Sequence, residues 1–179
     1  LVRHIGALDG LRRLRVSSIE PGDVTERFVE ALAETDTVAH HLHIPLQSGD
    51  DGVLAAMGRS YTMDAYVQAV GWAREAIPTV NITTDVIIGF PTEDEDAFDR
   101  THALCEELGF GKIHVFPFSP RPGTVAADLG DRVEPDEKAR RSQSLRDLSD
   151  RLGFARRVAR KGETDAVLVE RRLDDDTLT

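Results

Sequence analysis

Polar side chains follow each of four apolar, β-branched segments in this sequence of 179 residues. The set combines two carboxylates, an amide, hydroxyl groups and an arginine, and together these groups could hold a polar, zwitterionic small molecule. Arg59 follows Gln47 closely enough, through one short helix, to join the set. The other members are Ser17, Ser18, Glu20, Ser48, Asp85, Gly89, Ser119 and Arg121.

We predict a strand for each of the four segments, because they are short, β-branched and bounded by proline or glycine. Amphipathic stretches between them predict helices, and this alternation is typical of an α/β fold with a parallel sheet. Parallel α/β folds bind ligands at the carboxyl ends of their strands, so the polar set should meet there. The predicted strands are 14–19, 41–46, 81–88 and 112–118, with 81–88 buried on both faces; the predicted helices begin near Asp23 and at 93–96, and others cover 53–57, 63–76 and 134–160.

Single members of the polar set also have simpler explanations. Glu20 precedes a proline and could close a turn, and Gln47 and Ser48 could belong to the start of a helix. Asp85 could be a structural carboxylate at a strand end, although its apolar neighbours would still require a partner for it. Only the joint placement of these residues at strand ends favours ligand binding.

Histidines and cysteine provide little support for a metal site. Alternation along the second strand places His41 and His43 on one face, and His40 directly precedes them in the sequence. No carboxylate cluster accompanies these histidines in the sequence. Packing or hydrogen-bonding roles are therefore favoured for them. The one cysteine, Cys105, fits the apolar pattern of its helix and is predicted to lie in the core. One cysteine can form neither an internal disulfide nor a cysteine-based metal centre.

Charge is unevenly distributed along the chain. The formal net charge of -10 argues against a protein that coats nucleic acid by bulk attraction, but residues 132–161 contain ten Lys or Arg and five Asp or Glu. This basic stretch is either an RNA contact or a solvated helix face. No apolar run approaches the ~20 residues of a membrane-spanning helix, so we expect no membrane association and a cytoplasmic location. The chain begins without Met or a signal-peptide pattern, which suggests a start inside a longer reading frame.

Five strings in the sequence closely resemble, in order and spacing, the second half of the radical S-adenosylmethionine (SAM) domain of tRNA methylthiotransferases. They are RLRVSSIEP, HLHIPLQSG, MGRSY, TDVIIGFPTE and HVFPFSPRPGT, and they cover roughly residues 10–160. The wording of HLHIPLQSG is most similar to the branch that modifies threonylcarbamoyladenosine beside the anticodon. In this family a cluster-bound SAM yields a 5′-deoxyadenosyl radical, which abstracts hydrogen from the adenine before sulfur and methyl are delivered.

The resemblance implies a role for each member of the polar set. A carboxylate, a glutamine, an arginine and an aspartate on successive strands bind SAM in related enzymes, and these positions match Glu20, Gln47, Arg59 and Asp85. The string that ends at Glu93 is similar to the motif whose backbone lies along the adenine, although Thr92 stands where the family usually has glycine. The implied SAM-binding set also includes Ser48 and Gly89, and the implied contacts to substrate phosphate or base are Ser119 and Arg121.

The resemblance also implies the organisation of the protein. Residues 1–161 would form the carboxyl-terminal part of a partial (βα) radical SAM barrel, and 162–179, with a strand at 165–170, would begin a small TRAM-like RNA-binding β domain. The [4Fe–4S] clusters would take their ligands from cysteines upstream of Leu1, so this chain would hold no metal and no catalytic residue and would be inactive alone. Partners would be SAM and tRNA. Another radical SAM activity, or a cluster-free SAM- and RNA-binding module, remains an alternative.

Overall fold

A computed structural model describes residues 1–164, and the predicted strand at 165–170 and most of the predicted TRAM-like segment lie outside them. The sheet has three parallel strands in the order β1-β2-β3, which are His41–His43, Asn81–Ile88 and Lys112–Pro117. Two long helices follow the alternating pattern, α4 (Met63–Ala76) between β1 and β2 and α5 (Glu95–Leu108) between β2 and β3. The sheet is open at both edges rather than closed into a barrel, which agrees with the predicted half-barrel.

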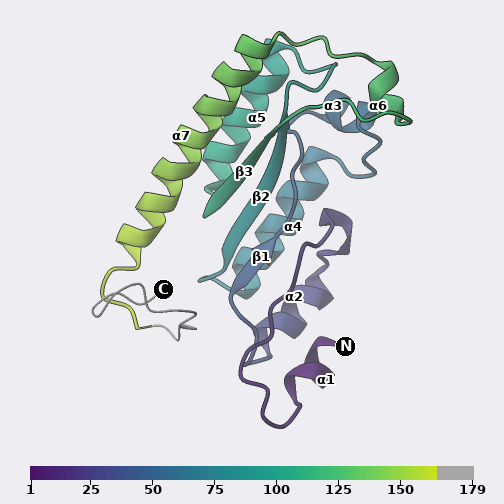
Figure 1. Cartoon of the computed structure of the whole chain (residues 1–179). Coiled ribbons are helices and arrows are strands. Elements are labelled where there is room, and N and C mark those ends of the chain that lie inside the picture. The colour runs from purple at the N-terminus through teal and green to yellow at the C-terminus, as the bar shows by residue number, and fades with distance from the viewer. Residues whose placement is uncertain (165–179) are drawn as a thin grey trace, which may run out of the picture.

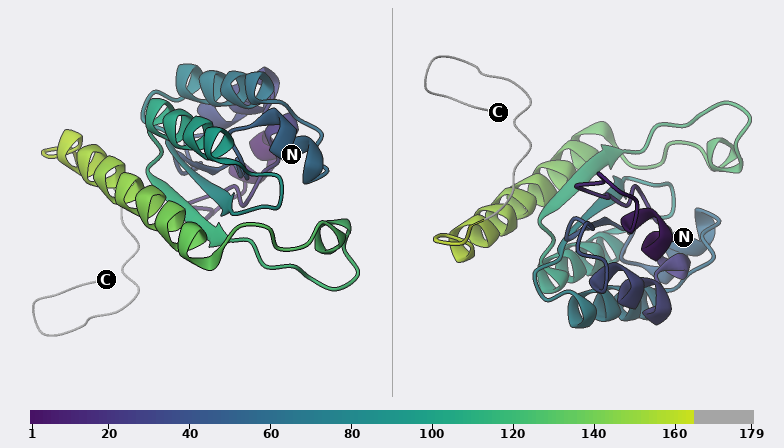
Figure 2. Two further views of the ribbon diagram at one scale, coloured as in Figure 1. Left: turned by 90° about the horizontal axis from the view of Figure 1, so that it is seen from above. Right: turned by 90° about the horizontal axis from the view of Figure 1, so that it is seen from below.

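The remaining elements are helical. Helix α2 (Glu26–Ala33) packs against α4, and the 25-residue helix α7 (Pro135–Ala159) runs along β3 (Figure 1). Figure 2 shows that the segment between β3 and α7 extends away from the sheet and the other helices. The short elements are α1 (Val2–Gly6), the 3-10 turn η1 (Pro21–Asp23), α3 (Asp51–Ala56) and α6 (Val125–Asp128).

The main apolar core lies between the sheet and its helices. Alternate residues of β2, including Ile82, Val86 and Ile88, point toward α4 and α5 and are at most 2% exposed. Tyr66 of α4 is fully buried there, and its hydroxyl donates to the carbonyl of Ile44 at 2.7 Å. Because side chains alternate along a strand, the residues between these core positions face the opposite side of the sheet.

That opposite face is only partly covered, and this corrects the prediction that 81–88 is buried on both faces. Asn81, Asp85 and Ile87 are half-buried. The face carries polar side chains of all three strands, because Thr83 is the register partner of His43 in β1 and Asp85 is the partner of His114 in β3. We call this side of the sheet the open face.

The first predicted strand, 14–19, does not form a ladder. The segment runs parallel to β1 but pairs only at two isolated bridges, Leu14 with Val38 and Ser18 with His43. The second predicted strand also ends early, at His43, because Pro45 has no N–H to continue the ladder. The chain nevertheless stays beside β2, since the Gln47 N–H donates to the Asp85 carbonyl at 2.8 Å.

Helix starts differ slightly from the predictions. The helix predicted to begin near Asp23, α2, begins at Glu26 instead, because the Thr25 hydroxyl caps it by accepting from the Phe28 N–H. The helix predicted from 93–96 begins at Glu95, and the Asp94 carboxylate accepts from the Ala97 N–H at 2.8 Å. The carboxyl end of β2 therefore passes into a capped helix through only a short loop.

Candidate functional site

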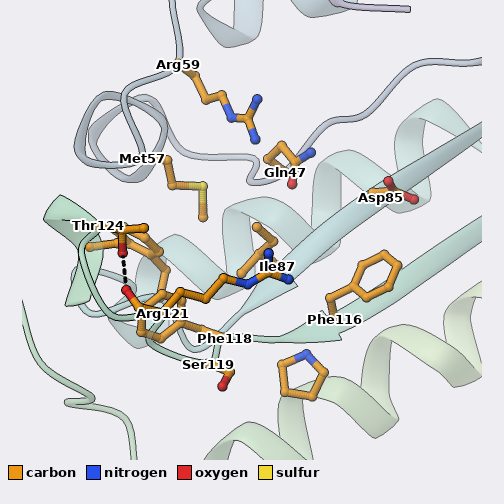
Figure 3. Close-up of a pocket in the computed structure, with 13 residues that line it drawn as sticks. Gln47, Met57, Arg59, Asp85, Ile87, Phe116, Phe118, Ser119, Arg121 and Thr124 are labelled. Atoms are coloured by element: carbon orange, nitrogen blue, oxygen red, sulfur yellow. Dashed lines mark hydrogen bonds between the residues drawn. The ribbon is translucent and has the colours of Figure 1, made fainter. Parts of the chain in front are cut away.

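A cavity of about 530 Å³ lies where β2 and β3 end. Figure 3 shows Arg59, Met57 and Gln47 on one side of it and Arg121 and Phe118 on the other. Five residues predicted from the sequence line it: Gln47, Arg59, Asp85, Ser119 and Arg121. The structure therefore brings side chains from three connecting segments and β2 to one place at the carboxyl ends of the strands, as parallel α/β folds require.

Gln47 has an unusual backbone conformation at the edge of this cavity. Its φ of 64° makes it the single residue other than glycine with positive φ in the described part of the chain. Both of its peptide groups are held by β2, through Gln47 N–H to the Asp85 carbonyl and Ile87 N–H to the Gln47 carbonyl at 2.9 Å. Such a conformation is strained for a residue with a Cβ, and strain of this kind concentrates at ligand sites.

Arg59 stands between the cavity and a neighbouring one. Helix α3, capped by the Asp50 carboxylate, ends in a turn at Gly58, whose φ of 73° lets the chain reverse and present Arg59. Its Nη1 lies 3.6 Å from Glu20 Oε1. Its Nε is buried and has no hydrogen-bond partner in the described structure. A buried guanidinium N–H without an acceptor is costly, so this atom indicates a place for an acceptor group of a ligand.

Glu20 does not line the main cavity. It borders a second hollow of about 520 Å³ together with Arg59 and Tyr61. Arg59 lines both hollows, so the two are adjacent. Glu20 is connected to the main cavity by its ion pair with Arg59.

Three of the predicted residues have buried structural contacts instead of cavity positions. Ser48 is fully buried beside Thr101. The Gly89 N–H donates to Glu93 Oε1 at 2.9 Å, and Glu93 also accepts from Arg141 Nη1 at 2.9 Å. Burial raises the pKa of Glu93, while the Gly89 and Arg141 donors oppose that effect. In this structure these groups fix the loop after β2, and the Glu93 side chain does not reach the cavity.

Three side chains on the open face form a further cluster. His43 Nε2 lies 3.3 Å from Asp85 Oδ2, and ligand atoms of His43, Asp85 and His114 all lie within 4.8 Å of one another. Two imidazoles and a carboxylate could hold a divalent transition-metal ion. The sequence shows no carboxylate cluster beside the histidines, but strand pairing brings one carboxylate, that of Asp85, to His43 from a distant part of the sequence. Ser17 and Ser18 lie beside this cluster rather than in the main cavity.

The apolar lining of the main cavity was missed by sequence reasoning. Met57, Ile87, Phe116 and Phe118 provide surfaces on which a flat aromatic base could pack. Ile87 could have been found, because it lies two residues after Asp85 and side chains at this spacing share a face of a strand. Met57 had no such signal, since its place depends on how α3 turns back.

These features define an open, parallel α/β half-barrel with a mixed polar and apolar cavity at the carboxyl ends of its strands. Residues 1–105 match the family model described as the Radical SAM superfamily, and the chain belongs to that family. No helix of the described residues is long and apolar enough to cross a membrane.

Curated relatives are tRNA-modifying enzymes. The chain is 42% identical over 161 residues to the tRNA-2-methylthio-N(6)-dimethylallyladenosine synthase of Symbiobacterium thermophilum, a match that covers 90% of this chain and 34% of the relative. It is 41% identical over 145 residues to the Threonylcarbamoyladenosine tRNA methylthiotransferase MtaB of Bacillus subtilis, which covers 81% of this chain and 32% of the relative. The chain thus spans about a third of the length of these relatives, and the predicted resemblance to tRNA methylthiotransferases is confirmed.

Solved structures show the same fold. The radical SAM enzyme coproporphyrinogen III oxidase (HemN) of Escherichia coli matches with a TM-score of 0.65 at 19% identity, over 79% of this chain and 32% of that one. The radical SAM methyltransferase TsrM of Kitasatospora setae matches with a TM-score of 0.54 at 18% identity, over 65% of this chain and 23% of that one. Both are radical SAM enzymes, which agrees with the family assignment.

The described residues fit SAM but not an iron–sulfur cluster. SAM combines a carboxylate, an ammonium group, ribose hydroxyls and adenine, and the cavity combines a buried arginine donor, a carboxylate, an amide and apolar surface. A cluster requires thiolates, and Cys105 is buried in the core, where burial raises its pKa to about 12. This part of the chain therefore provides no cluster ligand.

Proposed function

We propose that this chain is the SAM-binding part of an enzyme that adds a methylthio group to a hypermodified adenosine of tRNA. The observation that carries the proposal is the convergence of Gln47, Arg59 and Asp85 on one cavity, with the buried Arg59 Nε lacking a partner in the described structure. The names of the curated relatives supply the reaction class.

Each cavity residue has a role that follows from its chemistry. The Arg59 guanidinium donates to the carboxylate of SAM, and Gln47 and Asp85 accept from its ammonium group or ribose hydroxyls. Met57, Ile87 and Phe116 pack against the adenine. Glu20 acts through its ion pair with Arg59, and Ser119 and Arg121 lie at the cavity's rim, where an incoming nucleotide would meet them.

This assignment gives the chain binding and positioning roles only. A [4Fe–4S] cluster supplies the electron that cleaves SAM in this superfamily, and no ligand for it is present in residues 1–164. We therefore expect the isolated chain to bind SAM but to leave tRNA unmodified. The location we propose is the cytoplasm.

The finer proposal is that the substrate is threonylcarbamoyladenosine. The wording of HLHIPLQSG supports it, and a relative with that substrate in its name matches at 41% identity. Relatives named for dimethylallyladenosine match at 42% identity, so the two substrates must be separated by experiment.

A pair of chimaeras tests the reaction and the substrate together. This segment would replace the matching segment of the Bacillus subtilis enzyme in the first chimaera and of the Symbiobacterium enzyme in the second, and tRNA nucleosides would be analysed by mass spectrometry in cells that lack methylthiotransferases. We expect methylthio-threonylcarbamoyladenosine from the first chimaera, and Asp85→Asn should abolish it. Two folded but inactive chimaeras that still bind SAM would contradict methylthio transfer and favour a binding module.

SAM binding can be measured on this chain directly. Equilibrium dialysis with radiolabelled SAM should show that Arg59→Gln and Asp85→Asn each weaken binding about tenfold or more, because each removes a charged partner from a desolvated site. Arg151→Gln is the matched control, since this exposed arginine pairs with Glu106 far from the cavity. Equal affinity in all three variants would exclude the cavity as the SAM site.

A further inference from the structure

A continuous row of hydrogen bonds crosses the open face and ends at His43, whose Nε2 faces Asp85. Arg15 Nη2 lies 3.0 Å from His41 Nδ1, and His41 Nε2 lies 3.1 Å from the hydroxyl oxygen of Thr83. The same oxygen lies 2.9 Å from His43 Nδ1, and His43 Nε2 lies 3.3 Å from Asp85 Oδ2. We call Arg15, His41, Thr83 and His43 the histidine relay.

The direction of this row follows from which groups can donate. A guanidinium only donates, so His41 Nδ1 must accept, and its ring proton is on Nε2. His41 Nε2–H therefore donates to Thr83. The Thr83 hydroxyl, which has no other acceptor among the hydrogen bonds of the described residues, donates in turn to His43 Nδ1.

The contact at the far end of the row is compatible with this arrangement. A carboxylate accepts hydrogen bonds, and His43 Nε2, the nitrogen left to carry the proton when Nδ1 accepts from Thr83, lies 3.3 Å from Asp85 Oδ2. Thr83 is 8% exposed and the side chains of His43 and Asp85 are 20% and 27% exposed, so water competes weakly for these bonds.

We propose that His43 is a positioning residue for Asp85 and that the histidine relay fixes its proton on Nε2. The Nε2 proton would then face Oδ2 of Asp85, which leaves Oδ1 for a ligand in the cavity that Asp85 lines. The relay itself is independent of the ligand, but its effect on SAM rests on the proposed function.

The histidine relay also argues against metal binding by the cluster of His43, Asp85 and His114. A cation at His43, Asp85 and His114 would need the lone pair of His43 Nε2, and the relay places a proton on that atom. Without a metal, His43 Nδ1 accepts from Thr83 and His43 Nε2 faces Asp85 Oδ2 at 3.3 Å. The hydrogen-bonding pattern therefore favours a positioning network over a metal site.

Nitrogen NMR of the histidine-labelled chain tests the relay without SAM. Long-range proton–nitrogen spectra at pH 8 distinguish the two neutral tautomers, and His43→Gln identifies the resonance. We expect both His41 and His43 to carry the proton on Nε2. A proton on Nδ1 of His43 would overturn the proposal, as would micromolar Zn²⁺ displacing the Nε2 proton and shifting His43 and His114 together.

Two variants of Thr83 then separate the relay from simple packing. Thr83→Ser keeps the hydroxyl, and Thr83→Val keeps the shape without it. We expect Thr83→Ser to retain the His43 tautomer and Thr83→Val to give a mixture, with SAM affinity lowered about three- to tenfold in Thr83→Val only. Identical tautomers in the two variants would refute the relay. If the tautomers behave as expected but wild type does not bind SAM, the proposed function fails and the relay stands.

Discussion

The guanidinium of Arg141 donates to the carboxylate of Glu93 across 2.9 Å, and their side chains are 6% and 1% exposed. This pair joins α7 to the loop that follows β2. Arg141 also pairs with Glu95 and Glu137, so one buried arginine ties three acidic residues together. The sequence of the loop after β2 resembles an adenine-binding motif. Helix α7 thus fixes this loop through the ion pair of Arg141 with Glu93.

Removing one partner of this pair should be strongly destabilising. Arg141→Ala leaves the buried Glu93 carboxylate without its charged donor, and we expect a loss of about 3–5 kcal/mol in the free energy of unfolding measured with urea. Arg151→Ala, which breaks the exposed pair with Glu106, should cost no more than about 1 kcal/mol. Similar losses in both variants would show that the Arg141 pair has no special role.

A glycine at position 47 should increase stability and reduce SAM binding. Gln47 has a φ of 64°, and glycine adopts positive φ without the steric cost of a Cβ. Gln47→Gly should therefore raise the free energy of unfolding by about 0.5–1 kcal/mol, while SAM affinity falls because the amide is lost. Gln68→Gly on the exposed surface of α4 is the matched control, and it should lower stability by about as much. If both substitutions destabilise the protein, positive φ at Gln47 is not a source of strain.

Cys105 should be inert to thiol reagents in the native protein. Burial raises its pKa to about 12, so at pH 8 only about one molecule in ten thousand carries the reactive thiolate. The raised pKa also means that this group's contribution to stability is complete below the unfolded pKa of about 9 and is lost as pH rises toward 12. We expect no reaction with Ellman's reagent at pH 8 until urea unfolds the chain.

A relocated cysteine provides the control for that experiment. Ser60 is exposed, so the double variant Cys105→Ala with Ser60→Cys should react within seconds to minutes in the native state. Rapid labelling of Cys105 itself in folded protein would mean that α5 opens locally and that the buried position does not persist.

Local patterns in the sequence identified the elements that are long and strongly periodic. The predicted helix 63–76 and strand 81–88 agree with α4 and β2, and 134–160 agrees with α7 to within one residue at each end. Such elements bury a repeating apolar face, and that face is visible in the sequence. The segment 14–19 has the same β-branched composition but forms only two bridges, because composition does not show whether a neighbouring strand is in reach.

The sequence predicted those cavity residues whose positions follow from the order and ends of the strands alone. Gln47 and Asp85 line the cavity because they lie at or near strand ends. Glu93 does not line the cavity, because its carboxylate pairs with Arg141 of α7. The motif that contains Glu93 could not predict this pair, since Arg141 lies far along the chain. The pairing of His43 with Asp85 was missed for the same reason, since it depends on the register between β1 and β2.

The basic stretch of α7 is partly neutralised within the molecule, and this determines which residues can contact RNA. Arg140, Arg141 and Arg151 pair with acidic side chains, so their charges are already compensated. Arg146 and Arg157 are exposed on the same helix and take part in no ion pair within residues 1–164. If α7 contacts tRNA, these two arginines are therefore the better candidates for phosphate contacts.

Salt dependence distinguishes such contacts from a merely solvated helix face. Each phosphate contact releases bound counterions, so replacing both Arg146 and Arg157 by alanine should weaken tRNA binding and reduce the slope of log affinity against log salt by about two. The matched double variant Arg140→Ala with Arg151→Ala removes the same charge but should leave the slope nearly unchanged, because those side chains are held by α5. Filter binding at several salt concentrations measures both slopes. Equal slopes in the two double variants would show that α7 attracts RNA only through its net charge, and an unchanged slope in both would remove α7 from the RNA surface.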